Sequence, residues 1–358
     1  MIVLTIEIGV REAFGMIALR EAIKRHGHDC IVLPRFVLPR IATVLSGSVV
    51  VIDGAREVKG RRKLLTRLKK NNNLVCLFDT EGFALKEDKL RLRYPDANLK
   101  FIDYILTWGQ STNAWLLYKG FEEKLKPFGN PQFAYFETRK DAIDNDATTN
   151  YILANTAFPA ADVISESVKL TETRIADAKK IRKKFVEYLN KKYDKNTLRI
   201  RVHPNERTDF YENMDFNICN NRKTSSFEDI LKAKEVIGVN CTTLVEAKIV
   251  GKEATNILME TQRHEDIEAI CNNVDPNGML VASPYRTLES ILFTSTAGYD
   301  LDFQSKTLIE MDSENKKLPF VLGVIIKFLS FSLRYIHLSE ARKYNYSYVK
   351  KVSKIIGI

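Results

Sequence analysis

The sequence predicts an α/β protein made of two doubly wound domains in tandem. Its 358 residues are more than one hydrophobic core usually spans. Short apolar runs alternate with helical patterns in both halves of the chain, which is typical of parallel sheets whose strands are connected by helices. A charged and polar stretch without apolar periodicity, "ETRKDAIDNDATTN", separates the two halves and marks a domain boundary.

Residues 1–145 form the first of these series. Strands are expected at "IVLTIEI", "CIVL", "SVVVID", "NLVCLFD" and "IDYILTWG", and helices at "MIALREAIKRHG", "RRKLLTRLKKN" and "STNAWLLYKG". This alternation predicts an N-terminal Rossmann-like domain.

Residues 146–317 form the second series. It has strands at "YILANT", "TLRIRVHP", "EVIGVN" and "ATNILM", a long helix over 172–193, shorter helices at "FEDILKAK" and "TLVEAKIVG", and another starting near His264. Two Rossmann-like domains facing a cleft constitute the GT-B architecture. Ligands of such sheets bind beyond the carboxyl ends of the strands, so residues that end strands are the candidates for function. Dehydrogenases and epimerases are also built from such domains, so the fold alone leaves the function open.

Composition and charge limit the classes of partner. The chain is 45% hydrophobic and 28% charged, as in ordinary globular proteins. Its five scattered cysteines have no metal-ligand spacing, and the N-terminus lacks a signal-peptide pattern, which predicts a reduced, cytoplasmic protein. A net charge of +10 suits an anionic membrane or a phosphorylated substrate. Nucleic acid is not expected, because the basic residues are spread through helices and no aromatic-interleaved RNA motif is present.

Candidate anion-binding residues end two strands of the second domain. His203 and Pro204 close "TLRIRVHP", and a histidine there can donate to a phosphate oxygen. A helix opens at Thr242 and Thr243, with Glu246 completing a capping box, and the free N–H groups of a helix start attract anions. We expect a phosphate between these neighbouring strand ends. The structural alternative is that both features only cap their elements.

Candidate acids end a strand of the first domain. "NLVCLFD" is followed by Thr80, Glu81 and Gly82, so Asp79 and Glu81 stand where a carboxylate can take a proton from an acceptor hydroxyl. The structural alternative is a pair of solvated acids in a glycine turn. Reading Asp79 and Glu81 as a DxD-like metal pair suits a single-domain GT-A enzyme better.

Three weaker candidates also follow strands. Each is expected either to touch nucleotide or to cap a turn or helix. They are Gly129, Asn130 and Pro131; Asn155 and Thr156; and Glu260 with His264.

Five of these motifs, in order, carry a family resemblance. "DTEG", "GNPQF", "LANTAF", "RVHP" and "NCTTLVEA" resemble bacterial surface-carbohydrate biosynthesis glycosyltransferases of GT-B fold, relatives of CMP-donor sialyltransferases and Kdo transferases. The resemblance covers about residues 74 to 252. The chain departs from the family at Thr80, Gln132 and Ala134, and the first departure leaves Asp79 competing with Glu81 for the role of base.

The resemblance implies a site and a reaction. Glu81 is then the general base, His203 and Pro204 contact the donor phosphate, and Thr242 and Thr243 complete the phosphate site. Residues 1–145 bind the acceptor and residues 146–317 the donor. The implied enzyme is a metal-independent glycosyltransferase without a cofactor, which moves a sialic acid or Kdo type sugar from a CMP-linked donor to a bacterial surface glycan or glycolipid.

Three alternatives remain open. A CDP-polyol phosphotransferase of the teichoic acid type resembles the same HP and helix-start elements. A UDP-sugar-dependent GT-B enzyme or epimerase shares the two-domain fold. An inactive scaffold of a polysaccharide assembly complex is consistent with the departures from the family pattern.

Residues 318–358 form a helical, basic C-terminal segment. Lys327 and Arg334 interrupt its apolar stretch, which argues against a transmembrane helix. The segment is expected either to pack back on the first domain or to lie as an amphipathic helix on lipid, with Phe328, Phe331 and Tyr335 in the bilayer and its lysines toward anionic headgroups. We therefore predict a cytoplasmic protein held peripherally on the inner membrane.

Overall fold

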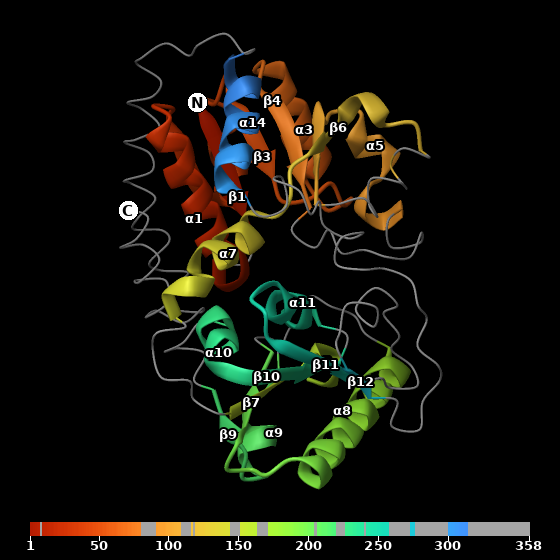
Figure 1. Cartoon of the computed structure of the whole chain (residues 1–358). Coiled ribbons are helices and arrows are strands. Elements are labelled where there is room, and N and C mark those ends of the chain that lie inside the picture. The colour runs from red at the N-terminus through yellow and green to blue at the C-terminus, as the bar shows by residue number, and fades with distance from the viewer. Residues whose placement is uncertain are drawn as a thin grey trace. The chain divides into compact units, whose positions relative to one another are not determined.

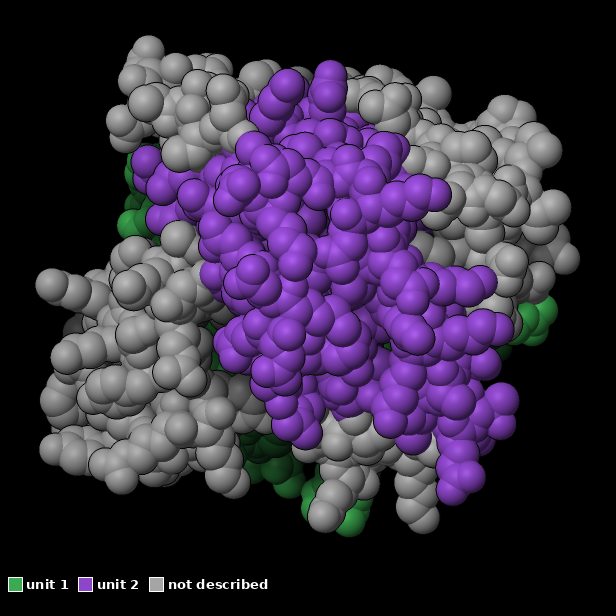
Figure 2. All heavy atoms as spheres, turned by 90° about the horizontal axis from the view of Figure 1, so that it is seen from below, with its two compact units in different colours: residues 1–135, 289–358 green, residues 136–288 purple. Residues whose placement is uncertain are grey.

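The structure is a computed structural model in which the chain forms two compact units. It describes residues 1–7, 9–79, 91–108, 116, 119–143, 151–162, 171–203, 206–219, 226–239, 241–257, 273–275 and 300–313. Unit 1 consists of Met1–Tyr135 with Glu289–Ile358, and unit 2 is Phe136–Leu288. Figure 1 shows the elements and Figure 2 colours the two units.

Unit 1 is built on a parallel sheet of six strands in the order β2-β1-β3-β4-β5-β6. The strands are β1 Ile2–Ile6, β2 Cys30–Pro34, β3 Val49–Ile52, β4 Leu74–Phe78, β5 Tyr104–Thr107 and β6 Leu125–Pro127. The helices are α1 Gly9–Arg25, α2 Leu38–Ile41, α3 Arg61–Lys70, α5 Asp96–Leu99, η1 Glu122–Lys124 and α14 Leu301–Ser313.

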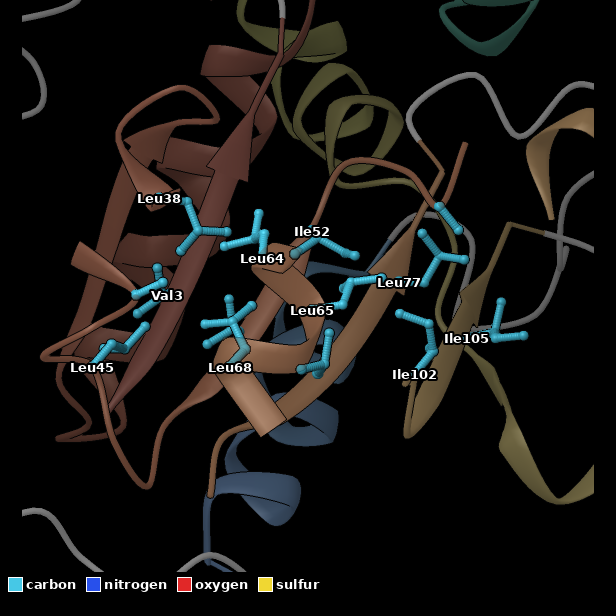
Figure 3. Close-up of a cluster of buried hydrophobic side chains, with 14 of the residues drawn as sticks. Val3, Leu38, Leu45, Ile52, Leu64, Leu65, Leu68, Leu77, Ile102 and Ile105 are labelled. Atoms are coloured by element: carbon cyan, nitrogen blue, oxygen red, sulfur yellow. The ribbon is translucent and has the colours of Figure 1, made fainter. Parts of the chain in front are cut away.

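The core of unit 1 explains its strand sequences. Strand β3 is a continuous apolar run and β1 is interrupted only by Thr5, because both faces of these strands are buried. On one face, Leu64, Leu65 and Leu68 of α3 recur at helical spacing and pack against the sheet in a cluster that also contains Leu38 of α2 (Figure 3). Helices α2 and α3 therefore cover the same face of this sheet.

The opposite face of unit 1 is covered by α1 and α14. Leu308 and Met311 of α14 are buried, and the helix contacts α1, β1 and β3. The N-terminal amine of Met1 donates to Asp312 Oδ1 at 2.9 Å. The domain boundaries expected from the sequence place α14 in the second domain. Its residues instead belong to unit 1, where they pack on α1, β1 and β3.

Unit 2 has a second parallel sheet of six strands, in the order β12-β11-β10-β7-β8-β9. The strands are β7 Tyr151–Asn155, β8 Leu198–Arg201, β9 Asn217–Ile218, β10 Ala233–Gly238, β11 Glu253–Ile257 and β12 Asn273–Asp275. The helices are η2 Pro159–Ala161, α8 Glu172–Lys192, α9 Asp209–Glu212, α10 Ser226–Lys232 and α11 Thr242–Ile249.

Helix α8 lies within one residue of its predicted range. Thr171 caps it by accepting a hydrogen bond from the N–H of Arg174 at 3.3 Å. Its buried face includes Phe185 and Leu189, and the ring of Phe185 lies 5.4 Å from that of Phe158. The local pattern was sufficient here because apolar residues recur at helical spacing along this segment and charged residues occupy the positions between them.

The "GNPQ" stretch starts helix α7, Pro131–Ile143, which contains the division between the units. Gly129 has a φ of +79°, and Asn130 Oδ1 accepts from the N–H of Gln132 at 2.9 Å. Gln132 Oε1 in turn accepts from the N–H of Gly15 in α1 at 2.9 Å. This stretch therefore forms the start of α7 and contacts α1. Of the two roles expected for it, capping and nucleotide contact, the structure shows the cap.

Candidate functional site

The carboxyl edge of unit 2's sheet brings together polar residues from several strands. In register, Asn256 of β11, Gly238 of β10, Asn155 of β7 and Arg201 of β8 lie next to one another. The sequence predicts that His203 and the helix start after β10 follow neighbouring strands. Strand β7 instead lies between β8 and β10, so Asn155 at the end of β7 lies between His203 and the start of the helix.

Asn155 presents an unused hydrogen-bond donor at this edge. The residue is 4% exposed, and its Nδ2 atom has no hydrogen-bond partner in the described part of the chain. Gly238 makes the local approach possible, because a Cβ there would lie 2.6 Å from Cys241 Sγ and 3.3 Å from the Asn155 carbonyl oxygen. A buried amide nitrogen without an acceptor is uncommon in folded proteins, and a ligand oxygen would satisfy it.

The start of α11 lies directly after β10. The helix begins at Thr242 as predicted, but its N-cap is Cys241, which makes no side-chain cap. The expected capping box is wrong, because the N-cap is Cys241 and not Thr243, so the residue three positions after the cap is Leu244 and the buried Glu246 lies deeper in the helix. Thr242 is exposed and Thr243 half-buried, with its Oγ1 at 2.9 Å from Cys241 Sγ. Desolvation raises the pKa of the Cys241 thiol to about 11, so it stays neutral at pH 7 beside the first-turn N–H groups.

His203 is half-buried at the end of β8, and its backbone is held on both sides. Its N–H donates to Thr156 Oγ1 at 2.8 Å, and its carbonyl accepts from the N–H of Glu206 at 2.9 Å. The Thr156 hydroxyl also donates to Glu206 Oε1 at 2.9 Å. Thr156, predicted to touch nucleotide, thus has its hydroxyl occupied in fixing the turn that carries His203.

Glu206 is the residue of this edge that sequence reasoning missed. It is 5% exposed and accepts from the Phe158 N–H and the Tyr211 hydroxyl, both at 2.6 Å, besides Thr156. Burial raises the pKa of its carboxyl, and these hydrogen bonds oppose the rise. The available signal was the position of an acid three residues after His203 in "RVHPNE", one hydrogen-bonded turn away.

Asp79 occupies the carboxyl end of β4 in unit 1. It is 8% exposed, and Arg93 Nη1 donates to both of its oxygens at 3.1 Å. Burial, followed by the charge of Asp79, raises the pKa of the neighbouring Tyr94 hydroxyl. An ion-paired, buried carboxylate is poorly suited to accept a proton from substrate. Glu81, Pro204 and Glu260 lie outside the described residues, so their roles stay predictions.

A second acid, Asp53, follows the neighbouring strand β3. It is 6% exposed and lies between Arg61, whose Nη1 is 3.6 Å from Oδ1, and Arg35, whose Nη1 donates to Oδ2 at 3.3 Å. Arg35 also donates to Glu7 Oε1 at 2.5 Å, after β1. The acids that end these strands are therefore neutralised by arginines. "SVVVID" carried the signal, since it too ends in an aspartate.

Within the described ranges, no three His, Cys, Asp or Glu side chains are grouped so as to hold a metal ion. The same part of the chain contains no helix with both the length and the apolar character needed to cross a membrane. The C-terminal segment 318–358 lies outside it.

Comparison with known proteins shows similarity at the level of fold. No family model and no curated protein matches the chain. The UDP-GlcNAc 2-epimerase of Methanocaldococcus jannaschii, solved in complex with UDP-GlcNAc and UDP, is similar with a TM-score of 0.56 and 11% identity, over 88% of this chain and 99% of that chain.

Two further solved structures have lower scores. The UDP-GlcNAc 2-epimerase of Neisseria meningitidis bound to UDP-GlcNAc has a TM-score of 0.48 at 11% identity, over 88% of this chain and all (100%) of that one. The wall teichoic acid polymerase TagF H548A has a TM-score of 0.47 at 11% identity, over 87% and 89%. The relationship to CMP-donor sialyltransferases and Kdo transferases stays a prediction. The fold-class prediction is confirmed: the chain has two parallel-sheet α/β domains, similar to those of a GT-B-like UDP-GlcNAc 2-epimerase.

Proposed function

We propose that this chain is an enzyme acting on a nucleotide-linked substrate, with a UDP-linked sugar as the first candidate. The carboxyl edge of unit 2's sheet binds the phosphates. The observation that carries the proposal is the buried Asn155 Nδ2 without an acceptor, on the strand between His203 and the start of α11. The fold shared with an epimerase solved with UDP-GlcNAc and UDP supports the choice of nucleotide.

The chemistry of such a substrate matches these groups. When the bond between the sugar and the nucleotide breaks, negative charge grows on the departing phosphate oxygens. Asn155 Nδ2, the first-turn N–H groups of α11 and the imidazole of His203 are fixed donors that stabilise this charge. Thr156 and Glu206 hold the backbone at His203 and act as positioning residues. A base is still required, and Glu81 remains its proposed position.

The second candidate is transfer from a CMP-linked sugar to a surface glycan or glycolipid, which rests on the sequence resemblance. A CDP-polyol phosphotransferase is the third. These reactions share the phosphate site and differ in the base and in the group that moves. The choice among them is a proposal about nucleotide recognition, and ligand binding tests it directly.

Titration calorimetry with UDP, CDP, CMP and GDP separates the candidates. We expect UDP to bind best and Asn155→Ala to weaken it about ten- to hundredfold, through loss of a hydrogen bond to a charged phosphate. His203→Ala should have a similar effect, and Asn190→Ala, an exposed amide on α8, should have none. Preference for CMP would support the transferase instead. No binding of any nucleotide would overturn the proposal and leave the inactive scaffold.

Product analysis then identifies the reaction. Incubation with UDP-GlcNAc should give either a sugar epimer, visible by NMR, or release of UDP that depends on an added acceptor. The first result supports an epimerase and the second a transferase.

A further inference from the structure

We propose that the face of unit 1 formed by α2 and α3 is a docking surface for an anionic lipid bilayer. This inference goes beyond the proposed function. It concerns a helical surface of unit 1, whereas the proposed nucleotide site lies in unit 2. It also differs from the membrane contact predicted for residues 318–358, which lie outside the described part of the chain.

Helix α3 carries far more positive charge than its surroundings neutralise. It has six basic side chains and no acidic one, and its leucines occupy the face that packs on the sheet. Three of the basic residues have acidic partners: Arg61 with Asp53 at 3.6 Å, Arg62 with Glu57 at 2.6 Å, and Lys69 with Asp103 at 2.6 Å.

The other three, Lys63, Arg67 and Lys70, form a stripe along one side of the helix. Spacings of four and three residues place them on the same face. No ion pair involves them among the described residues, and together with Thr43 and Thr66 they line an open groove of about 570 Å³. Unpaired cations that line an open groove attract anionic groups.

Exposed apolar side chains stand at the N-terminal ends of the same two helices. Phe36, just before α2, is 41% exposed, and Val58, just before α3, is 54% exposed. They are two of the three large hydrophobic side chains exposed among the described residues. The guanidinium of Arg40 lies 5.9 Å from the centre of the Phe36 ring.

This combination favours a lipid surface over a soluble polyanion. Cations alone suffice to bind a polyanion, whereas exposed aromatic and aliphatic groups beside cations are typical of segments that bind the bilayer interface. Helix α8 of unit 2 provides the contrast: it is also basic, but Glu172, Asp177 and Glu187 are interspersed along it.

Vesicle flotation of the full chain tests the proposal. The parent should bind phosphatidylcholine vesicles that contain phosphatidylglycerol, bind pure phosphatidylcholine weakly, and dissociate at high salt. The triple change K63Q/R67Q/K70Q should reduce the partition coefficient about a hundredfold, since each cation near an anionic surface contributes about fivefold.

The charge-matched control is K179Q/K180Q/K191Q on α8, where all three lysines are exposed. It removes the same charge and should retain vesicle binding to within a few fold. Phe36→Trp should show a blue-shifted fluorescence on anionic vesicles relative to the parent, which reports entry of this position into lipid.

Four results would overturn the inference: equal losses in both triple variants, unchanged vesicle binding by the α3 triple, loss only on deletion of residues 340–358, or retained vesicle binding with lost binding of polyphosphate. UDP titration of the same variants keeps the two proposals separate. Unchanged nucleotide binding with lost vesicle binding supports the docking surface, and absent nucleotide binding in the parent counts only against the proposed function.

Discussion

At the residue scale, one buried carboxylate organises the end of unit 2's sheet. Glu206 accepts hydrogen bonds from Thr156, Phe158 and Tyr211, which belong to the segments after β7 and to α9. It thereby joins the end of β7 to the turn that follows β8. The backbone of His203 in "RVHP" is hydrogen-bonded to Thr156 and Glu206, so this network fixes its position after the strand.

We expect Glu206→Ala to lower the free energy of unfolding by at least about 3 kcal/mol. The change leaves three buried donors without an acceptor, each costing about 1–3 kcal/mol. Glu206→Gln keeps an acceptor oxygen and should cost less than half as much. Urea denaturation followed by circular dichroism measures both, and equal losses would show that hydrogen bonding is not the reason for the effect.

The same residue predicts a pH dependence of stability. Burial raises the pKa of Glu206 above its usual value of 4.5, so the native state holds this proton more tightly than the unfolded state. The resulting stabilisation is complete below the unfolded pKa and is lost as pH rises through the raised native pKa. The free energy of unfolding of the parent minus that of Glu206→Gln should therefore increase as pH falls towards 4.5. A pH-independent difference would contradict the assignment.

Asp79 and Glu81 are expected to respond differently to neutralisation. Asp79→Asn removes the negative charge that pairs with Arg93. It should lower the free energy of unfolding by about 1–3 kcal/mol, because the arginine side chain is largely buried. Glu81→Gln should reduce turnover about 10²-fold with nucleotide binding retained, the usual scale for a positioned base. Thermal melts and kinetics of both variants decide; a catalytic loss confined to Asp79→Asn would move the base by two residues.

At the element scale, a glycine determines how α7 meets α1. A Cβ at Gly15 would lie 2.4 Å from the Gln132 backbone nitrogen, so the two helices approach this closely only with glycine here. Asn130 and Gly129 then supply the cap and the left-handed turn that begin α7.

Gly15→Ala should therefore destabilise the protein by about 1–3 kcal/mol or more, because the clash is with backbone atoms that cannot rotate away. Gly54→Ala is the matched control, since no atom lies within 4 Å of the added Cβ. It should change stability by less than about 0.5 kcal/mol. Thermal melts of the two variants provide the comparison, and similar losses would argue against close packing at Gly15.

At the scale of the whole molecule, the chain has two compact units with separate cores, and we expect the two units to unfold in separate transitions. Both tryptophans, Trp108 and Trp115, belong to unit 1, so their fluorescence reports this unit alone. Circular dichroism reports both units together.

Leu308→Ala in α14 should lower the midpoint of the fluorescence-detected unfolding transition. The change opens a cavity in unit 1, which lowers the free energy of unfolding by about 2–5 kcal/mol. Leu189→Ala in α8 removes an equally buried side chain from unit 2 and should shift the circular dichroism transition while leaving the fluorescence transition in place. An unchanged fluorescence transition in Leu308→Ala would show that α14 does not belong to the core of unit 1, and a fluorescence shift in Leu189→Ala would show that the two units do not unfold separately.

Local sequence patterns were sufficient to predict the class of fold and the type of most elements. Apolar periodicity and caps are local, so they predict β1, β3 and α8 from the residues of those segments alone. The same reasoning placed candidates at strand ends, because parallel strands present their carboxyl ends at one edge whatever their order.

Which candidate residues lie together depends on the order of the strands and could not be predicted from local patterns. Strand order places β7 between β8 and β10, and so brings Asn155 between His203 and Thr242. Two of the donors to Glu206, Thr156 and Phe158, lie about 50 positions away in sequence, and α14 returns to cover strands near the N-terminus. These features depend on contacts between segments that are distant in sequence. Such contacts are set by the packing of the whole sheet, and they produce no periodic pattern in the sequence.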